Sequence, residues 1–234
     1  NWPGLPQGTF AVKPGPVEAS SNYFRVTVTG KGGHAAMPHE AVDPVMICSQ
    51  LIQAFQTIIS RNKRPLEPAV VSVTRINGGH ALNIIPEICE IQGTVRAFSP
   101  QTLDLIETRM REITGGLCAG FGATHEFAFE RKSPATINDP AQAEQVRQAL
   151  VNFAGPERVV EFEPTMGAED FSYFLEEKPG CYFFVGNDAA GAESETPPSP
   201  PCMLHNPHYD FNDALIPLGG TAWVRLVEHL LPAG

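Results

Sequence analysis

The sequence predicts an α/β protein whose larger part is a ferredoxin-like (βαββαβ) domain. Between residues 22 and 133, the patterns read strand, helix, strand, strand, helix, strand. The composition, 42% hydrophobic and 18% charged over 234 residues, is that of a globular chain. Residues 1–133 carry 12 basic and 11 acidic side chains, whereas residues 134–234 carry 4 and 15. This step in charge indicates two physical units joined near residue 133.

Four segments of the first unit are expected to be strands. Residues 23–30 alternate, so that Phe24, Val26 and Val28 face one side of a half-buried strand. The segment 69–76 is rich in Val and Thr, and Asn77-Gly78-Gly79 after it is a turn signal. The remaining two strands are expected at 88–97 and 124–132.

Two helices are expected between these strands. The first opens at Asp43-Pro44, since Pro is tolerated in the first turn. The second starts at Ser99, a plausible N-cap. Apolar residues recur at spacings of three and four in both: Val45, Cys48, Ile52, Phe55 and Ile59, then Leu103, Ile106, Met110, Ile113 and Leu117.

Fewer helices and strands are predicted for the second half of the chain. Helices are expected at 140–153, at 169–176 and at the C-terminus, with Trp223, Val227 and Leu230 of the last one facing inward. The apolar run 180–186 is typical of a strand buried on both faces, and 187–201 has the composition of a mobile loop. One buried strand cannot close a core, so this half is expected to need a sheet from elsewhere.

Composition also excludes several classes of function. The net charge of −10 disfavours nucleic-acid binding, and no run of about 20 apolar residues predicts a membrane span. The five cysteines are odd in number and contain no CxxC pair, which favours reduced, mostly buried thiols and a cytoplasmic location.

Histidines mark two candidate sites. The segment LHNPHYDFND at 204–213 places His205 and His208 close to two carboxylates, a set that suits a divalent metal. It could equally be a polar loop with Asp213 capping a helix, and Pro207 argues against both imidazoles sharing a helical face. His34 lies in the glycine-rich stretch 30–39, where it could reach a ligand or simply be exposed.

Three further positions have two interpretations each. Arg96 could hold a carboxylate in a bidentate pair or form a cross-strand salt bridge. Asn83 could be a turn residue or a substrate donor. Glu169, followed by Asp170, could be an acidic helix N-terminus or a pocket residue.

Five motifs together resemble one family. GKGGHAAMPHEAVDP, NGGHALNIIP, GTVRAF, MGAEDFSYF and LHNPHYDFND resemble metal-dependent amidohydrolases of the hippurate hydrolase, N-acyl-amino-acid hydrolase and auxin-conjugate hydrolase type, within the aminoacylase–carboxypeptidase metallopeptidase family. The resemblance implies a ferredoxin-like dimerisation (lid) domain at 22–133, inserted in an α/β zinc-peptidase-like catalytic domain that is incomplete here and is represented by 1–21 and 134–234.

The resemblance also implies residue roles. His205 matches a metal ligand, and His34 matches a lid histidine that stabilises the oxyanion in the partner subunit's site. Asn83 and Arg96 match lid residues that hold the substrate's carboxylate end. Glu169 lies in a pocket-lining motif without an assigned role.

The family's Cys-x-His and Glu-Glu motifs and one further ligand histidine do not occur in the 234 residues. We therefore expect this chain to be part of a longer, homodimeric protein and to be inactive alone. The intact protein is expected to bind two divalent metals per subunit (Zn, Mn or Ni) and to hydrolyse N-acyl amino acids. The alternative is a non-catalytic ferredoxin-like dimerisation or binding module.

Overall fold

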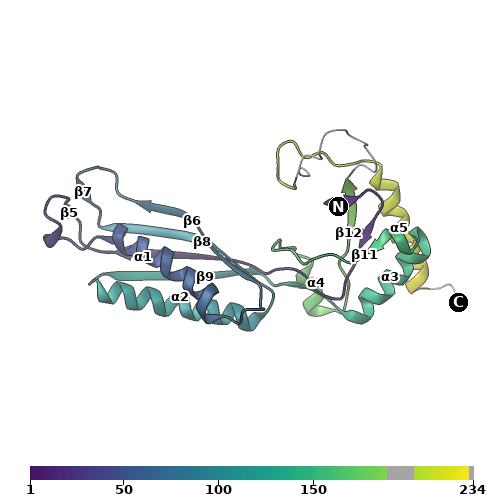
Figure 1. Ribbon diagram of the computed structural model, residues 1–234, viewed down its shortest axis with the longest axis horizontal. Coiled ribbons are helices and arrows are strands. Elements are labelled where there is room, and N and C mark those ends of the chain that lie inside the picture. The colour runs from purple at the N-terminus through teal and green to yellow at the C-terminus, as the bar shows by residue number, and fades with distance from the viewer. Residues whose placement is uncertain (189–202, 232–234) are drawn as a thin grey trace. The chain divides into compact units, whose positions relative to one another are not determined.

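The computed structural model describes residues 1–188 and 203–231. The chain divides into two compact units (Figure 1). Unit 1 comprises residues 1–17, 137–164 and 173–234, and unit 2 comprises residues 18–136 and 165–172. A two-stranded sheet of β3 (Gly15–Glu18) and β10 (Thr136–Asn138) lies where the chain passes between the units.

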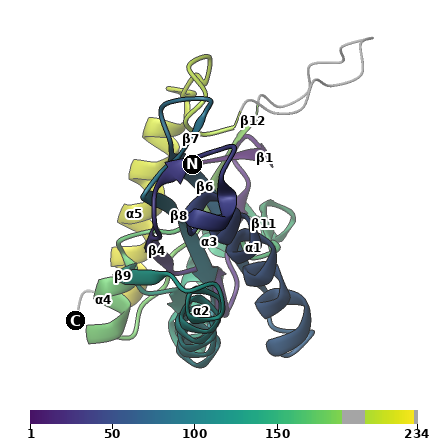
Figure 2. The same cartoon turned by 90° about the vertical axis from the view of Figure 1, so that its left-hand side faces the viewer.

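Unit 2 contains a four-stranded sheet in the order β6-β8-β4-β9. Its strands are β4 (Ser21–Thr29), β6 (Ala69–Gly78), β8 (Ile88–Ala97) and β9 (Thr124–Ser133), and every neighbouring pair is antiparallel. Helices α1 (Pro44–Thr57) and α2 (Pro100–Gly120) lie side by side against one face (Figure 2). This order confirms the ferredoxin-like topology that the element sequence predicts.

The core of unit 2 follows the predicted alternation of the strands. Phe24, Val26 and Val28 of β4 are all at most 3% exposed, and they pack with the inward residues of β8 and the two helices. In α2 the predicted residues Leu103, Ile106 and Met110 are buried. In α1 the prediction is partly wrong, because Ile47 and Leu51 are buried while Val45 is 36% exposed. The helix is apolar on several faces, so spacing alone does not select the buried one.

Both helices of unit 2 begin where their caps predict. The Asp43 carboxylate accepts hydrogen bonds from the backbone N–H of Val45 (2.8 Å) and Met46 (3.3 Å), and the Ser99 hydroxyl accepts from Thr102 N (3.1 Å). Two short helices flank α1. η1 (Pro38–Glu40) precedes it, and η2 (Ile58–Asn62) is its π-helical continuation.

Unit 1 is built on a sheet of short strands in the order β1-β12-β2-β11. They are β1 (Trp2–Pro6), β2 (Phe10–Ala11), β11 (Val159–Val160) and β12 (Phe184–Asp188). Helices α3 (Pro140–Ala154) and α5 (Leu215–Leu230) pack against Phe10 and Val12 on one side, and η3 (Pro156–Arg158) and α4 (Ser172–Glu177) complete the unit.

Several predictions for the second half are wrong in detail. The buried strand is shorter than 180–186, with only Phe184 and Gly186 fully buried, and α4 starts three residues after Glu169. In α5 the orientation is reversed: Trp223 is 62% exposed, Val227 56% and Leu230 44%. Ala222 and Leu226 pack in the cluster that contains α3 instead. The expected loop at 187–201 lies outside the described residues from 189 on, and Asn187 and Asp188 belong to β12.

The described cysteines form no disulfide. Cys48, Cys89, Cys118 and Cys181 are free thiols, and the first three are buried. Across residues 1–188 and 203–231, no helix has the length and apolar character needed to cross a bilayer.

Candidate functional site

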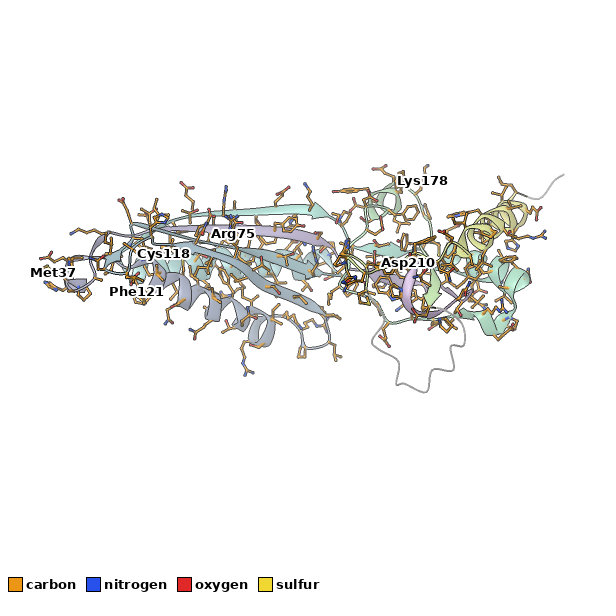
Figure 3. All side chains as sticks on the ribbon, turned by 90° about the horizontal axis from the view of Figure 1, so that it is seen from above. Met37, Arg75, Cys118, Phe121, Lys178 and Asp210 are labelled. Carbon is orange, nitrogen blue, oxygen red and sulfur yellow. The ribbon has the colours of Figure 1, made fainter. Side chains whose placement is uncertain are left out.

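His34 and Asn83 meet at one end of unit 2. His34 belongs to β5 (Gly33–His34), which pairs antiparallel with β7 (Ile84–Ile85), His34 lying opposite Ile84. The adjoining Ala35 N donates to the Asn83 carbonyl at 3.0 Å. Figure 3 shows Met37 of the same loop at the end of the unit, beyond the end of α2 where Cys118 and Phe121 lie. We call residues 30–42 and 79–87 the tip.

Glycine makes the tip possible at one position in particular. A Cβ on Gly30 would lie 2.1 Å from the Val42 carbonyl oxygen, so no larger residue fits there. This close approach lets Lys31 and Val42 form an antiparallel bridge, with hydrogen bonds of 2.9 and 3.0 Å. The glycine-rich sequence is therefore the cause of the turn that presents His34.

His34 is exposed, and one of its ring nitrogens is already bound. Nδ1 accepts a hydrogen bond from the Ala36 backbone N–H at 3.1 Å. A neutral imidazole carries one proton, so an accepting Nδ1 assigns that proton to Nε2. The Nε2–H is therefore the donor that His34 can offer to a ligand.

Arg96 lies on β8, opposite Val70 of β6, and its guanidinium donates a hydrogen bond to the Ser21 hydroxyl. The pKa of the Tyr23 phenol is lowered, mainly by its hydrogen bond with the Ser21 hydroxyl and secondly by its hydrogen bond with Arg96. Among the ion pairs of the described residues, none involves Arg96. The cross-strand salt bridge that was the alternative for Arg96 is thus not formed, and its charge is available to an external carboxylate.

His34 and Arg96 are far apart within unit 2. Arg96 is next to last in β8, whereas the tip begins at the other end, where Gly30 N donates to Glu87 O at 2.8 Å. Eight residues of strand from Ile88 to Arg96 span roughly 27 Å at about 3.4 Å per residue. One copy of this unit therefore brings His34 and Asn83 together but does not bring Arg96 to them.

His205 lies in a turn of unit 1 with a φ of 69°. It is the one non-glycine residue with positive φ in the described ranges, a backbone conformation that is uncommon for side-chain-bearing residues. The Asn206 side chain accepts from His208 N at 2.9 Å, and Asn187 of β12 bonds the loop through Asp210 O (3.3 Å) and Asn212 N (3.1 Å). The loop is non-helical, as Pro207 predicts, and Asp213 does not cap α5.

The described residues do not by themselves fit a metal centre. Residues 1–188 and 203–231 contain no group of three or more His, Cys, Asp or Glu side chains that could hold an ion. Catalytic zinc sites keep about three protein ligands, so His205 alone is insufficient.

One titratable residue of unit 2 was missed by sequence reasoning. Glu18 is only 6% exposed, and it lies beside Thr165 and Glu169 of the returning segment 165–172. Burial, and then the Glu169 charge, raise the pKa of Glu18 to about 7. A lone Glu at a strand end gives no sequence signal of burial, because its neighbours come from a segment almost 150 residues later.

Residues 19–118 match the family described as "Peptidase dimerisation domain" of the M20 group. These residues form a dimerisation domain of the M20 peptidase family. The match covers all of the β4–α1–β6–β8 arrangement and most of α2.

Curated proteins similar to this chain carry the names of hydrolases, deacetylases and carboxypeptidases. "Thermostable carboxypeptidase 2" of Saccharolobus solfataricus is 41% identical over 182 residues, which is 77% of this chain and 46% of that protein. "IAA-amino acid hydrolase ILR1-like 4" of Arabidopsis thaliana is 34% identical over 97% of this chain and 51% of its own length. "N-acetyl-L-cysteine deacetylase" of Bacillus subtilis is 38% identical over 80% and 45%. The chain thus spans about half the length of these curated relatives.

Solved M20 structures share the fold. A putative aminohydrolase from methicillin-resistant Staphylococcus aureus superposes with a TM-score of 0.83 and 29% identity, over 96% of this chain and 56% of that one. The Bacillus subtilis YXEP protein, described as a dinuclear metal binding peptidase from the M20 family, gives 0.77 and 28%, over 99% and 55%.

Proposed function

We propose that this chain supplies the dimerisation domain and substrate-contacting residues of a metal-dependent amidohydrolase, and that the whole protein hydrolyses the amide bond of N-acyl amino acids. The observation that carries the proposal is Arg96, a half-buried guanidinium with a hydroxyl partner and no carboxylate in the described structure. Relatives named as an N-acetylcysteine deacetylase and an IAA-amino acid hydrolase support the same substrate class.

His34 and Arg96 take complementary roles in this proposal. The Nε2–H of His34 donates to the oxygen that gains negative charge as the amide is attacked, an interaction whose loss typically slows turnover about 100–1,000-fold. Arg96 binds the carboxylate of the amino acid through its paired N–H groups. Asn83, carried on the same tip as His34, is a second donor to the substrate.

We propose that the protein is a homodimer that pairs through β6. Both β6 and β9 are edge strands of the unit 2 sheet. The sequence of β9, THEFAFERKS, carries several charges, which discourage strand pairing, whereas AVVSVTRING of β6 carries only Arg75. A second copy paired along β6 would extend the sheet and bring only the Arg75 of each copy, as charged side chains, into the paired edge.

His205 is proposed as one ligand of a divalent metal centre in the whole protein, with Zn, Mn and Ni equally compatible. Its other ligands would come from residues beyond the described part, since the described residues supply no cluster of three possible ligands. We expect the 234-residue chain alone to show no hydrolysis. The free, buried thiols favour a reducing location such as the cytoplasm.

The experiment compares two substrates with the whole protein that contains this chain. An Arg96→Met variant should lose about 10- to 100-fold in kcat/KM on an N-acetyl amino acid, as expected for a charge-assisted hydrogen bond. It should change little on the matching N-acetyl amino acid amide, which has no carboxylate. Arg64→Met is the matched control, because the Arg64 side chain is 87% exposed on a connecting loop.

An equal loss on both substrates would contradict the carboxylate role of Arg96. Hydrolysis of either substrate by the purified 234-residue chain, with Zn, Mn or Ni added, would contradict its expected inactivity. A whole protein that dimerises but hydrolyses neither substrate would favour the alternative, a non-catalytic dimerisation module.

A further inference from the structure

Glu18 is the buried carboxyl group of unit 2. It is 6% exposed, and the other fully buried polar side chains of the described chain are hydroxyls and amides. An ionised carboxylate in such a position loses most of its hydration, so its charged form is disfavoured unless a cation compensates it. No cation appears among the groups that shift Glu18 in the described structure.

The segment 165–172 returns from unit 1 to pack on this position. Thr165 forms a parallel bridge with Glu18, and its carbonyl accepts from Ala19 N at 3.2 Å. The Thr165 hydroxyl accepts from Gly167 N at 3.1 Å and is hydrogen-bonded to the Glu18 carboxyl. Glu18 therefore holds the start of the segment through one side-chain contact and one neighbouring backbone contact.

Gly167 shows how closely the segment approaches the carboxyl group. A Cβ built on Gly167 would lie 2.9 Å from Glu18 Oε1 and 3.0 Å from Thr165 Oγ1. The backbone of the segment thus lies directly against the Glu18 carboxyl group, leaving no room for a hydration shell between them.

The charged side chain that acts on Glu18 is acidic. Its own strand β3 and the paired strand β10 contain no other titratable side chain, and the start of β4 contains none before Tyr23. The segment contributes Glu169 and Asp170, and Glu169 is the charged group that acts on Glu18. The Glu169 carboxylate itself accepts from Asp170 N at 3.0 Å.

We propose that the protonation of Glu18 controls the docking of segment 165–172 on unit 2: the neutral carboxyl holds the segment, and the ionised carboxylate releases it. The inference does not depend on the proposed hydrolase activity, since it concerns the fold of this chain. It does concern a motif, MGAEDFS, to which the proposed function assigns no role.

The sign of the effect follows from the pKa of Glu18. Burial and Glu169 raise it from 4.5 to about 7 in the docked form, and release returns it towards 4.5. The docked form binds its proton more tightly, so the docking equilibrium is fully favourable below about 4.5. It weakens by up to about tenfold per pH unit between 4.5 and 7, and is constant above 7.

Amide hydrogen exchange of the 234-residue chain tests this directly. The Ala19 amide, which is bonded to Thr165 O, reports docking, and the Val26 amide in the middle of β4 serves as an internal reference. After correction for intrinsic exchange, the protection of Ala19 should fall by about 100-fold or more from pH 4.5 to 7. In Glu18→Gln, a neutral side chain of the same shape, it should stay high throughout. Glu126→Gln, an exposed change on β9, is the matched control and should behave as the wild type.

Protection of Ala19 that is independent of pH in the wild type, or that falls equally in Glu18→Gln, would overturn the proposal. If Glu18→Gln fails to fold, a carboxyl ¹³C titration of the wild type decides. A midpoint near 7 for Glu18 supports the proposal, and a midpoint below 5 overturns it.

Discussion

Gly93 of β8 lies directly opposite Phe24 of β4, and an added Cβ would stand 2.6 Å from two carbons of the Phe24 ring. The same Cβ would lie 2.0 Å from the Ser72 carbonyl oxygen of β6. The centre of the unit 2 sheet is therefore closed to any side chain at this position, since both neighbours belong to paired strands.

We predict that Gly93→Ala destabilises unit 2 by about 3 kcal/mol or more, because overpacking of about 1–3 kcal/mol adds to a clash with backbone. Gly116→Ala is the control. A Cβ there meets nothing within 4 Å on α2, so the change should stabilise the helix by about 0.5–1 kcal/mol. Urea denaturation measures both, and equal effects of the two substitutions would contradict the packing described for Gly93.

The edge-strand proposal predicts a position-specific loss of dimers. Ile76 of β6 is 50% exposed, so Ile76→Asp should leave the monomer folded but place two like charges in the paired edge. Ala128→Asp makes the same change on the exposed opposite edge, β9. Light scattering should show a monomer of 25.3 kDa for the first variant and a dimer for the second.

If Ala128→Asp dissociates the dimer while Ile76→Asp does not, β9 is the pairing edge and the argument from charge is wrong. Circular dichroism of both variants checks that each remains folded.

An ion-pair cluster between α2 and β9 predicts a pH dependence of opposite sign to that of Glu18. Arg131 contacts Asp104 at 2.6 Å and Glu107 at 2.9 Å. Burial raises the pKa of Glu107, but its hydrogen bonds to Arg111 and Arg131 lower it by more. The stabilisation is therefore present at neutral pH and is lost as the pH falls through the lowered pKa of Glu107.

We expect Arg131→Met to cost about 0.5–1 kcal/mol of unfolding free energy at pH 7, a value reduced by solvent screening. The cost should vanish by about pH 2, where the carboxylates are neutral. Arg147→Met, which removes an ion pair with Glu144 within the helix α3, should leave the stability unchanged at either pH because both side chains are 47% exposed. A cost of Arg131→Met that is the same at both pH values would exclude the electrostatic origin.

The sequence predicts unit 2 better than unit 1 for a physical reason. Alternation in β4 and caps at Asp43 and Ser99 are local signals, and each lies on an element that the structure contains. In α5 the buried residues are Leu215, Ala222 and Leu226, and the last two pack in the cluster that contains α3. Which face of a helix is buried depends on the elements that pack against it, and hydrophobicity alone therefore selected Trp223 wrongly.

In the candidate site, too, local signals were predictable from the sequence, whereas contacts between distant segments were not. The glycine-rich motif and the turn at Gly79 indicate loops, but only strand pairing shows that His34 and Asn83 share one. Sequence order gives no indication that Arg96 is at the other end of β8. Glu18 could not be found at all, since its burial and its raised pKa both come from segment 165–172.

We propose that each active site of the whole protein takes Arg96 and His34 from different subunits, because the strand from Ile88, beside the tip, to Arg96 spans roughly 27 Å. The most direct test mixes two inactive variants of the whole protein, His34→Ala and Arg96→Ala, under conditions in which subunits exchange. Random assortment gives half heterodimers, each with one intact site, so about a quarter of wild-type activity should return. Mixing His34→Ala with Asn83→Ala, which lie on the same tip, should restore none. Recovery with neither pair would contradict the shared site and show that each subunit acts alone.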